Sequence, residues 1–428
     1  MMLIKQHFLE IRRVFKNLFR SPFKTDNMIF IILLVMSTSI SAFLSPGHMN
    51  YLVVGLLVYL FVDFIFHPMK MNSSDAWLFI LLIMMFLTSY RHINTFKLSS
   101  ILYTTLYFVG FIRFGQFLSL STLTIEKVSK FLVFILYLYF YVLVIQQFCL
   151  LTGLPVINYT FGYAAEQQLR TNSLATEPSM AGIIVFMLMY FYIRCIEIGA
   201  GVKCTVKMLY RTNKSLLFMF LYAMITMGST TALFMLILLF IKLVSFRSGL
   251  KMIPLAILVV LTIRFVSPIS FERFEKNIVA ISTLDPVIIN ETDHSGAFRI
   301  IPPLVYCKEI DFFSVDNFFG FGRDYDKILF RKYLWDGSDV DINYGGIFPS
   351  FILYYGLVSF IVLLFIYKKK CIDKIFSIDT LIFIQMAVLG GLNTQSWAMA
   401  VLFFMLMKYL NRHKNRVPCC QGRKLITI

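Results

Sequence analysis

Charged side chains are scarce in this chain: only 15% of its 428 residues are Asp, Glu, Lys or Arg, whereas 58% are hydrophobic. With a mean hydropathy of +0.76, this composition excludes an ordinary soluble globule. Carboxylates are the scarcer charge, 23 against 40 basic residues. The Lys and Arg residues cluster in short segments beside apolar runs, as the positive-inside rule predicts for cytoplasmic loops. We therefore expect a protein whose partner is the lipid bilayer, with no binding of nucleic acid.

Cysteine is also sparse, and its spacing fits neither a disulfide framework nor a zinc site. Of the seven cysteines, only Cys307 falls in the one long polar segment, 267–343, so that segment cannot contain a disulfide of its own. The Cys419–Cys420 pair lacks the second pair of ligands that a structural zinc ion needs. Repeats of solenoid length are also absent from the sequence.

Apolar runs of roughly membrane-spanning length fill most of the chain. A perpendicular helix needs about 20 residues to cross the hydrocarbon core, and some of these runs are shorter. The runs 215–246 and 376–410 each break at a small polar turn, which predicts a tight hairpin of two spans; a long helix or a re-entrant pair is the alternative. The sequence thus predicts an all-α polytopic membrane protein with about twelve spans, at 28–44, 50–66, 76–90, 98–120, 131–152, 179–197, 215–228, 231–246, 252–266, 344–367, 376–391 and 395–410.

The distribution of charge predicts that both ends of the chain are cytoplasmic. Apolar and basic residues recur at helical spacing over 3–19, which predicts an amphipathic helix on the membrane surface; a solvated basic tail is the alternative. Asp63 and Arg113 both fall toward the inner side and are predicted to pair. The predicted organisation is a basic cytoplasmic segment (1–27), nine spans (28–266) with an outer loop at 152–179, a large periplasmic loop (267–343), three spans (344–410) and a basic cytoplasmic tail (411–428).

The loop at 267–343 is the only long polar segment, and it holds 13 of the 23 carboxylates. Backbone amides without partners are costly in hydrocarbon, so this loop is predicted to form a water-facing cap. The loop at 152–179 is the only other outer loop large enough to build a site. We expect a functional site beneath the cap, shared by both loops.

The smaller loop ends in a motif that starts the next helix. Arg170 is the only cation of this loop. Thr176 is predicted to be the helix N-cap, with Pro178 in the first turn. Glu177 would complement the positive end of the helix dipole. We regard Glu177 as a candidate proton acceptor, with the plain start of a helix as the structural alternative.

The large loop contributes candidates of three kinds. Gly320 and Gly322 form a glycine turn that would let the backbone approach a ligand closely, although no strand–helix unit supports a dinucleotide site. The candidate proton acceptors are His294 and Asp341, and an ordinary surface histidine is the alternative for the first. The candidate cations are Arg299 and Arg323 in the loop and Arg264 at the outer end of the preceding span, where snorkelling is the alternative.

Two Asp-x-Asp pairs also lie in this loop, Asp324/Asp326 and Asp339/Asp341. Such pairs can hold a divalent ion bound to a sugar nucleotide, but any solvated loop accumulates them, and calcium loops need more oxygen ligands at set spacing. We predict no metal site.

Four short motifs, taken in order, resemble those of the bacterial O-antigen polymerase family, whose relatives include the O-antigen ligases. Thr230 stands where members often place an arginine, and Asp341 lies near the position of a histidine in the ligase branch, which disfavours a ligase. The motifs are Arg170 with Glu177-Pro178-Ser179, the turn Met227–Ala232, Arg299 with Gly320-Phe321-Gly322, and Asp341-Ile342-Asn343-Tyr344 with Tyr355-Gly356.

The resemblance implies a GT-C-like membrane glycosyltransferase that polymerises undecaprenyl-diphosphate-linked oligosaccharides at the outer face of the bacterial inner membrane, in lipopolysaccharide biosynthesis. It also implies a chain-length regulator and a flippase as protein partners. As an acceptor hydroxyl attacks the anomeric carbon, negative charge builds on the departing diphosphate, which arginines bind in bidentate fashion. Because this donor carries its own activating group, no cofactor or metal is expected. The expected diphosphate contacts are Arg170, Arg264, Arg299 and Arg323, and the expected base is Glu177, Asp341 or His294.

Two other functions remain open at this stage. A flippase of lipid-linked oligosaccharides can also have about twelve spans, but transporters place polar groups at mid-membrane on broken helices, often in repeated halves. Here the polar groups gather outside the membrane. An O-antigen ligase would use the same chemistry with another acceptor.

Overall fold

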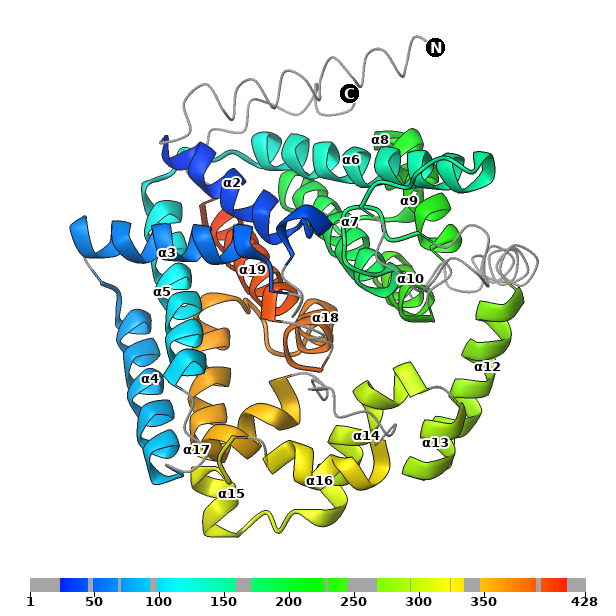
Figure 1. Cartoon of the computed structure of the whole chain (residues 1–428). Coiled ribbons are helices and arrows are strands. Elements are labelled where there is room, and N and C mark those ends of the chain that lie inside the picture. Colours follow the sequence, from blue (N-terminus) through cyan, green and yellow to red (C-terminus); the bar gives the residue numbers. More distant parts are fainter. Residues whose placement is uncertain are drawn as a thin grey trace. The chain divides into compact units, whose positions relative to one another are not determined.

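A computed structural model describes residues 24–44, 49–67, 71–92, 98–158, 171–227, 230–244, 268–292, 294–323, 325–334, 347–389 and 394–413. These residues form helices and connecting turns with no β-strand (Figure 1), which confirms the all-α class. The predicted amphipathic helix at 3–19, the predicted span at 252–266 and most of the basic tail lie outside the described residues.

Five of the described helices are long and apolar enough to cross a membrane. Each coincides with a predicted span, so the chain has the helices of a membrane protein. The count of about twelve spans and the GT-C-like architecture stay predictions. The five helices are α4 (Ser73–Arg91), α5 (Leu98–Leu120), α6 (Ile125–Thr152), α7 (Pro178–Ala200) and α17 (Ile347–Lys370).

Several other predicted spans are shorter helices. α9 ends at Thr226 and α10 begins at Thr230, so the run 215–246 forms two helices, as its polar turn predicts. α18 continues into a π-helical turn at Gln385–Leu389. The other elements are α2 (Thr25–Met36), a 3₁₀ turn η1 (Ser41–Phe43), α3 (Tyr51–Phe66), α8 (Val206–Thr212), α9 (Lys214–Thr226), α10 (Thr230–Leu243), α18 (Ile378–Ile384) and the longer α19 (Thr394–His413).

The chain divides into two compact units: Met1–Val54, Phe117–Glu272 and Leu406–Ile428 form the first, and Gly55–Gln116 and Arg273–Met405 form the second. In the first unit, α6 packs against α7 and α7 packs against α10. A Cβ on Gly182 of α7 would lie only 2.6 Å from the Cβ of Ala232 on α10. Small residues at such contacts let membrane helices approach closely.

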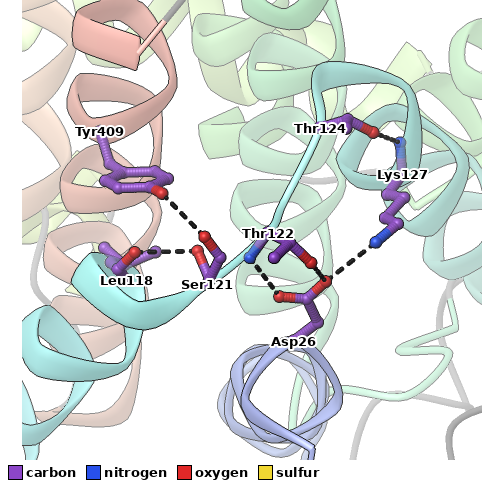
Figure 2. Close-up of polar contacts among 7 residues, drawn as sticks. All are labelled: Asp26, Leu118, Ser121, Thr122, Thr124, Lys127 and Tyr409. Carbon is purple, nitrogen blue, oxygen red and sulfur yellow. Dashed lines mark hydrogen bonds and ion pairs between the residues drawn. The ribbon is translucent and has the colours of Figure 1, made fainter. Parts of the chain in front are cut away.

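Polar contacts in the first unit hold the linker that precedes α6 (Figure 2). Asp26, in the first turn of α2, accepts hydrogen bonds from the backbone N–H and the hydroxyl of Thr122, both at 2.9 Å, and pairs with Lys127 of α6. Tyr409, near the end of α19, donates to the carbonyl of Ser121 at 3.2 Å. Segments far apart in the sequence thus fix one short linker.

In the second unit, α4 and α17 lie side by side and run antiparallel (Figure 1). Asp75, in the first turn of α4, forms a buried ion pair with Lys370, the last residue of α17. At the opposite end of α4, Arg91 pairs with Asp316 at 2.6 Å. The first pair brings the start of α4 to the end of α17, and the second joins the other end of α4 to the polar segment 267–343.

The predicted pair of Asp63 and Arg113 is confirmed, at 2.5 Å between α3 and α5. Arg113 is buried and also donates to the carbonyl of His67 at 3.0 Å and to the side chain of Gln116 at 3.1 Å. A buried guanidinium with this many acceptors stabilises the packing of the two helices.

The long polar segment is largely helical. Within it, α14 packs against α16 and α17, and α15 packs against α17. The elements are α12 (Pro268–Ser282), α13 (Pro286–Thr292), α14 (His294–Glu309), α15 (Val315–Phe319) and α16 (Tyr325–Leu334).

Candidate functional site

The predicted site residues belong to different units. Glu177 lies in the first unit, at the start of α7. The backbone of His294 begins α14 in the second unit, and its side chain is outside the described part. The second unit also holds Arg299, Gly320, Gly322 and Arg323. The predicted residues outside the described ranges are Arg170, Arg264 and Asp341.

Glu177 is itself the N-cap of α7, so the prediction of Thr176 as the cap is wrong by one residue. Pro178 occupies the first helical position, as predicted. Since a proline holds the residue before it in an extended conformation, Glu177 (φ −147°, ψ 160°) becomes the last non-helical residue. Its carboxylate makes no capping hydrogen bond. A negative charge beside the free N–H groups of a helix is nevertheless favourable.

A buried turn leads up to Glu177 and is held by amide side chains. Asn172 donates through Nδ2 to the carbonyl of Ala175 at 2.6 Å and to that of Asn158 at 2.8 Å. Gln146 of α6 accepts from the backbone N–H of Ser173 at 2.7 Å and donates to its carbonyl at 3.1 Å. These four bonds fix the backbone where the loop 152–179 ends.

The same turn carries backbone strain. Ser173 has a φ of 49° and is buried, and its hydroxyl donates to the carbonyl of Tyr139 at 2.7 Å. A left-handed conformation costs a residue with a Cβ about 1–2 kcal/mol. Such strain persists only where the surroundings over-determine it, and it clusters at functional sites. The strained turn directly follows Arg170 in the sequence and precedes Glu177.

In the second unit, the glycine turn docks where α17 is broken. Gly320 and Gly322 have φ values of 91° and 93°, and Gly356 interrupts α17 with a φ of 87°. The N–H of Phe321 donates to the carbonyl of Leu353 at 2.8 Å, one of the carbonyls exposed by the break. The turn therefore satisfies backbone that the helix leaves open.

The glycines are needed for contact between these two segments. A Cβ on Gly320 would lie 2.7 Å from the carbonyl oxygen of Tyr354, and one on Gly356 would lie 2.2 Å from that of Phe318. A Cβ on Gly322 would meet the ring of His92. The close approach expected at the glycine turn is therefore made with protein atoms, and contact of these glycines with a ligand stays a prediction.

Arg323 follows the glycine turn and carries the clearest binding feature of this unit. Its Nη1 atom is buried, and no described residue accepts a hydrogen bond from it. Arg323 follows directly on Gly322 and lies two residues after Phe321, whose N–H bonds the carbonyl of Leu353 near the break of α17. A buried donor without an acceptor costs about 1–3 kcal/mol and calls for an explanation. A bound phosphate or carboxylate oxygen would supply the acceptor.

The neighbouring candidates have other surroundings. Arg299 is half-buried on α14. Asp326 is buried and accepts a hydrogen bond from the hydroxyl of Tyr354 at 2.5 Å, so this member of an Asp-x-Asp pair helps to hold α16 on α17. Within the described ranges, no group of three His, Cys, Asp or Glu residues is placed to hold a metal ion.

An exposed ion pair joins α16 to the end of α14. Lys332 of α16 lies 2.6 Å from Glu309 at the end of α14, and the hydroxyl of Tyr333 donates to the same carboxylate. Partial burial raises the pKa of Glu309, but the hydrogen bonds from Lys332 and Tyr333 outweigh it and leave that pKa below its usual value. The pKa of Lys332 is raised by its hydrogen bond to Glu309.

Sequence reasoning missed several residues that shape these two regions. Gln146 gave the best signal, because Gln146-Gln147 is a polar pair inside an apolar run, and polar side chains within spans are usually functional or structural anchors. Asn172 and Ser173 read as ordinary loop residues. The hydrogen bond from Phe321 to Leu353 joins residues of separate elements and has no local signature.

Comparison of the chain with protein-family models, with curated proteins and with solved structures finds no match in any of the three.

Proposed function

We propose that this chain is a metal-independent membrane glycosyltransferase that polymerises undecaprenyl-diphosphate-linked oligosaccharide repeat units into a surface polysaccharide. The reaction would take place at the outer face of a bacterial inner membrane. The observation that carries the proposal is the buried Nη1 of Arg323, which has no acceptor among the described residues. Arg323 follows the turn whose Phe321 bonds Leu353 near the break of α17. The order of short motifs that resembles the O-antigen polymerases supports the same reaction.

The chemistry requires fixed positive charge where the diphosphate departs. The acceptor hydroxyl attacks the anomeric carbon, the bond to the diphosphate oxygen breaks, and the diphosphate leaves with the bonding pair. Arg323 would bind that oxygen or its neighbours, with Arg299, Arg170 and Arg264 as further contacts. Fixed donors aimed at developing charge contribute on the order of 2.7–4 kcal/mol each when tested by mutation.

A carboxylate takes the proton of the attacking hydroxyl in this scheme. Glu177 is suited by its place at the start of α7, where its carboxylate is not used in capping. Asp341 and His294 are the other candidates. Deprotonation by a positioned base contributes roughly 10²–10⁴-fold.

The test uses purified protein with a synthetic undecaprenyl-diphosphate-linked repeat unit, scored as a ladder of elongated products on gels. Arg323→Ala is expected to reduce elongation on the order of a hundredfold, and Arg323→Lys to rescue it poorly, because lysine lacks the bidentate geometry. Arg170→Ala and Arg299→Ala are expected to behave similarly. Arg331→Ala is the matched control, because Arg331 is an exposed arginine on α16, and it should elongate normally.

Normal ladders from well-folded Arg323→Ala would overturn the assignment of Arg323. The opposing result is a wild-type protein that fails to elongate the oligosaccharide in detergent and moves it across vesicle membranes. That result would identify a flippase and rule out the proposed enzyme. Transfer to a lipid A core acceptor in place of a second repeat unit would identify a ligase.

A further inference from the structure

The segment between α14 and the glycine turn exposes large apolar side chains to an unusual degree. Phe313 is 87% exposed, and Val315 and Phe319 of α15 are 64% and 55% exposed. Phe312 is 44% exposed. These four residues lie within the segment that its carboxylates mark as water-facing.

Hydrogen bonds hold this segment in its exposed conformation. The N–H of Phe313 donates to the carboxylate of Asp311 at 2.9 Å, and Ser314 caps α15 by accepting from the N–H of Asn317 at 3.1 Å. The amide of Asn317 donates to the carbonyl of Phe312 at 3.0 Å. The exposure of Phe313 is therefore built into a defined turn.

The polarity of α15 is inverted relative to a helix in water. Its buried face carries Asn317, which is 0% exposed and accepts a hydrogen bond from the hydroxyl of Tyr306 at 2.8 Å. Val315 and Phe319, four residues apart on one face, point outward. Leaving each large apolar side chain in water forfeits about 1.5–3 kcal/mol. This pattern fits an apolar medium around the helix.

The position of α15 identifies that medium. Asp316 pairs with Arg91, the last residue of α4, and Figure 1 shows α15 at this end of α4, beside α17. α4 is one of the candidate spans, and its last turns expose Leu87 and Tyr90. The exposed apolar surface of a membrane helix therefore continues into α15.

We propose that the segment Phe312–Phe319 inserts into the lipid bilayer at the boundary between headgroups and acyl chains. Aromatic side chains are favoured at this boundary. The insertion fixes the adjacent glycine turn, and with it Arg323, at the depth of lipid phosphates. This lipid contact does not depend on glycosyl transfer, and it stands even if the proposed reaction fails.

The test replaces Phe313 with the photo-crosslinker p-benzoylphenylalanine in the full-length protein, reconstituted in vesicles of phosphatidylethanolamine and phosphatidylglycerol. Irradiation is expected to give a covalent lipid adduct, found by mass spectrometry on the peptide that contains position 313, with attachment near the ester end of the acyl chain. The same substitution at Ile328 is the control. Ile328 is 74% exposed but shares its face of α16 with the charged Arg331 and Lys332.

A lipid adduct at position 313 and none at position 328 supports the insertion. Equal yields at both positions, or no adduct at either, would overturn it. A crosslinked dimer at position 313 would also overturn it and would assign this surface to a second copy of the chain. A large aromatic replacing an exposed phenylalanine preserves the fold, so each result can be interpreted.

Discussion

At the scale of single residues, Gly356 sets the geometry of the second unit. We expect Gly356→Ala to lower the melting temperature in detergent markedly, because its Cβ would lie 2.2 Å from a backbone oxygen and its φ is 87°. The left-handed conformation alone costs about 1–2 kcal/mol. Gly55→Ala is the matched control: it lies on α3 with no atom within 4 Å of the added Cβ. It should stabilise by about 0.5–1 kcal/mol. Equal melting temperatures for the two variants would contradict this account.

Ser173 permits a sharper comparison. Alanine is usually the more stabilising of alanine and glycine, and at Ser173 we expect the reverse. Ser173→Ala loses the hydrogen bond to the carbonyl of Tyr139 and keeps the left-handed φ of 49°. Ser173→Gly loses the same bond but relieves the strain, so it should be the more stable variant by about 1 kcal/mol. The two variants are compared by thermal unfolding. At Ser119, an exposed residue of α5, alanine should be the more stable, as in any helix. The same order at both positions would argue against strain at Ser173.

At the scale of elements, the contact between α14 and α16 depends on pH through Glu309. Its pKa is lowered from the usual 4.5 in the folded protein, so the stabilisation is present above pH 4.5 and is lost as the pH falls through the lower, folded-state pKa. The pKa of Lys332 is raised from 10.5. The stabilisation that protonated Lys332 contributes is therefore lost only as the pH rises above 10.5. We expect wild type to melt above Glu309→Gln at neutral pH, and the two to converge below pH 4.5.

The control for this prediction is Glu275→Gln on α12, where the side chain is exposed. Its melting temperature should track that of wild type throughout the acidic range. If Glu309→Gln differed from wild type by the same amount below pH 4.5 as at pH 7, the effect of Glu309 would not be electrostatic.

The ends of a helix could be predicted from the sequence where they coincide with the ends of an apolar run. α5 has the predicted bounds, 98–120. α6 begins at Ile125, earlier than the predicted 131, because Thr124 caps a first turn that is charged and lies outside the apolar run. α2 ends at Met36, well before the predicted 44, where the hydroxyl of Ser37 bonds the carbonyl of Leu33 at 2.6 Å. Serine and threonine compete with helical hydrogen bonds in this way.

The candidate site was predictable only in part, because contacts between distant segments decide much of it. The glycine turn was found because positive φ restricts the residue type. The break of α17 at Gly356 was not found, since a single glycine within an apolar run is compatible with a helix, and the docking of Phe321 onto Leu353 decides the outcome. Likewise, Gln146 and Ser173 meet across 27 residues, a pairing that no local pattern contains.

At the scale of the whole molecule, the ion pairs of the second unit constrain the topology. Asp75 and Lys370 bring the start of α4 and the end of α17 together, and these are the ends that the charge distribution predicts to be cytoplasmic. At the other end of α17, Tyr306 of α14 contacts Phe348, with ring centroids 5.4 Å apart. α17 is a candidate span by its length and composition, and the break at Gly356 lies within it.

Cysteine labelling tests which side each end faces. Cys307, on α14, is exposed, whereas Cys195, Cys204 and Cys371 are buried. With Cys149, Cys419 and Cys420 replaced by serine, we expect a membrane-impermeant maleimide to label Cys307 in cells with an intact inner membrane. If Phe376, fully exposed in the loop after α17, is changed to cysteine in a Cys307→Ser background, labelling should require permeabilised cells. Labelling of both positions in intact cells would show that α17 does not separate them across the membrane. The opposite pattern would invert the predicted orientation and move Arg323 to the cytoplasmic side, where an acceptor on the outer face cannot reach it.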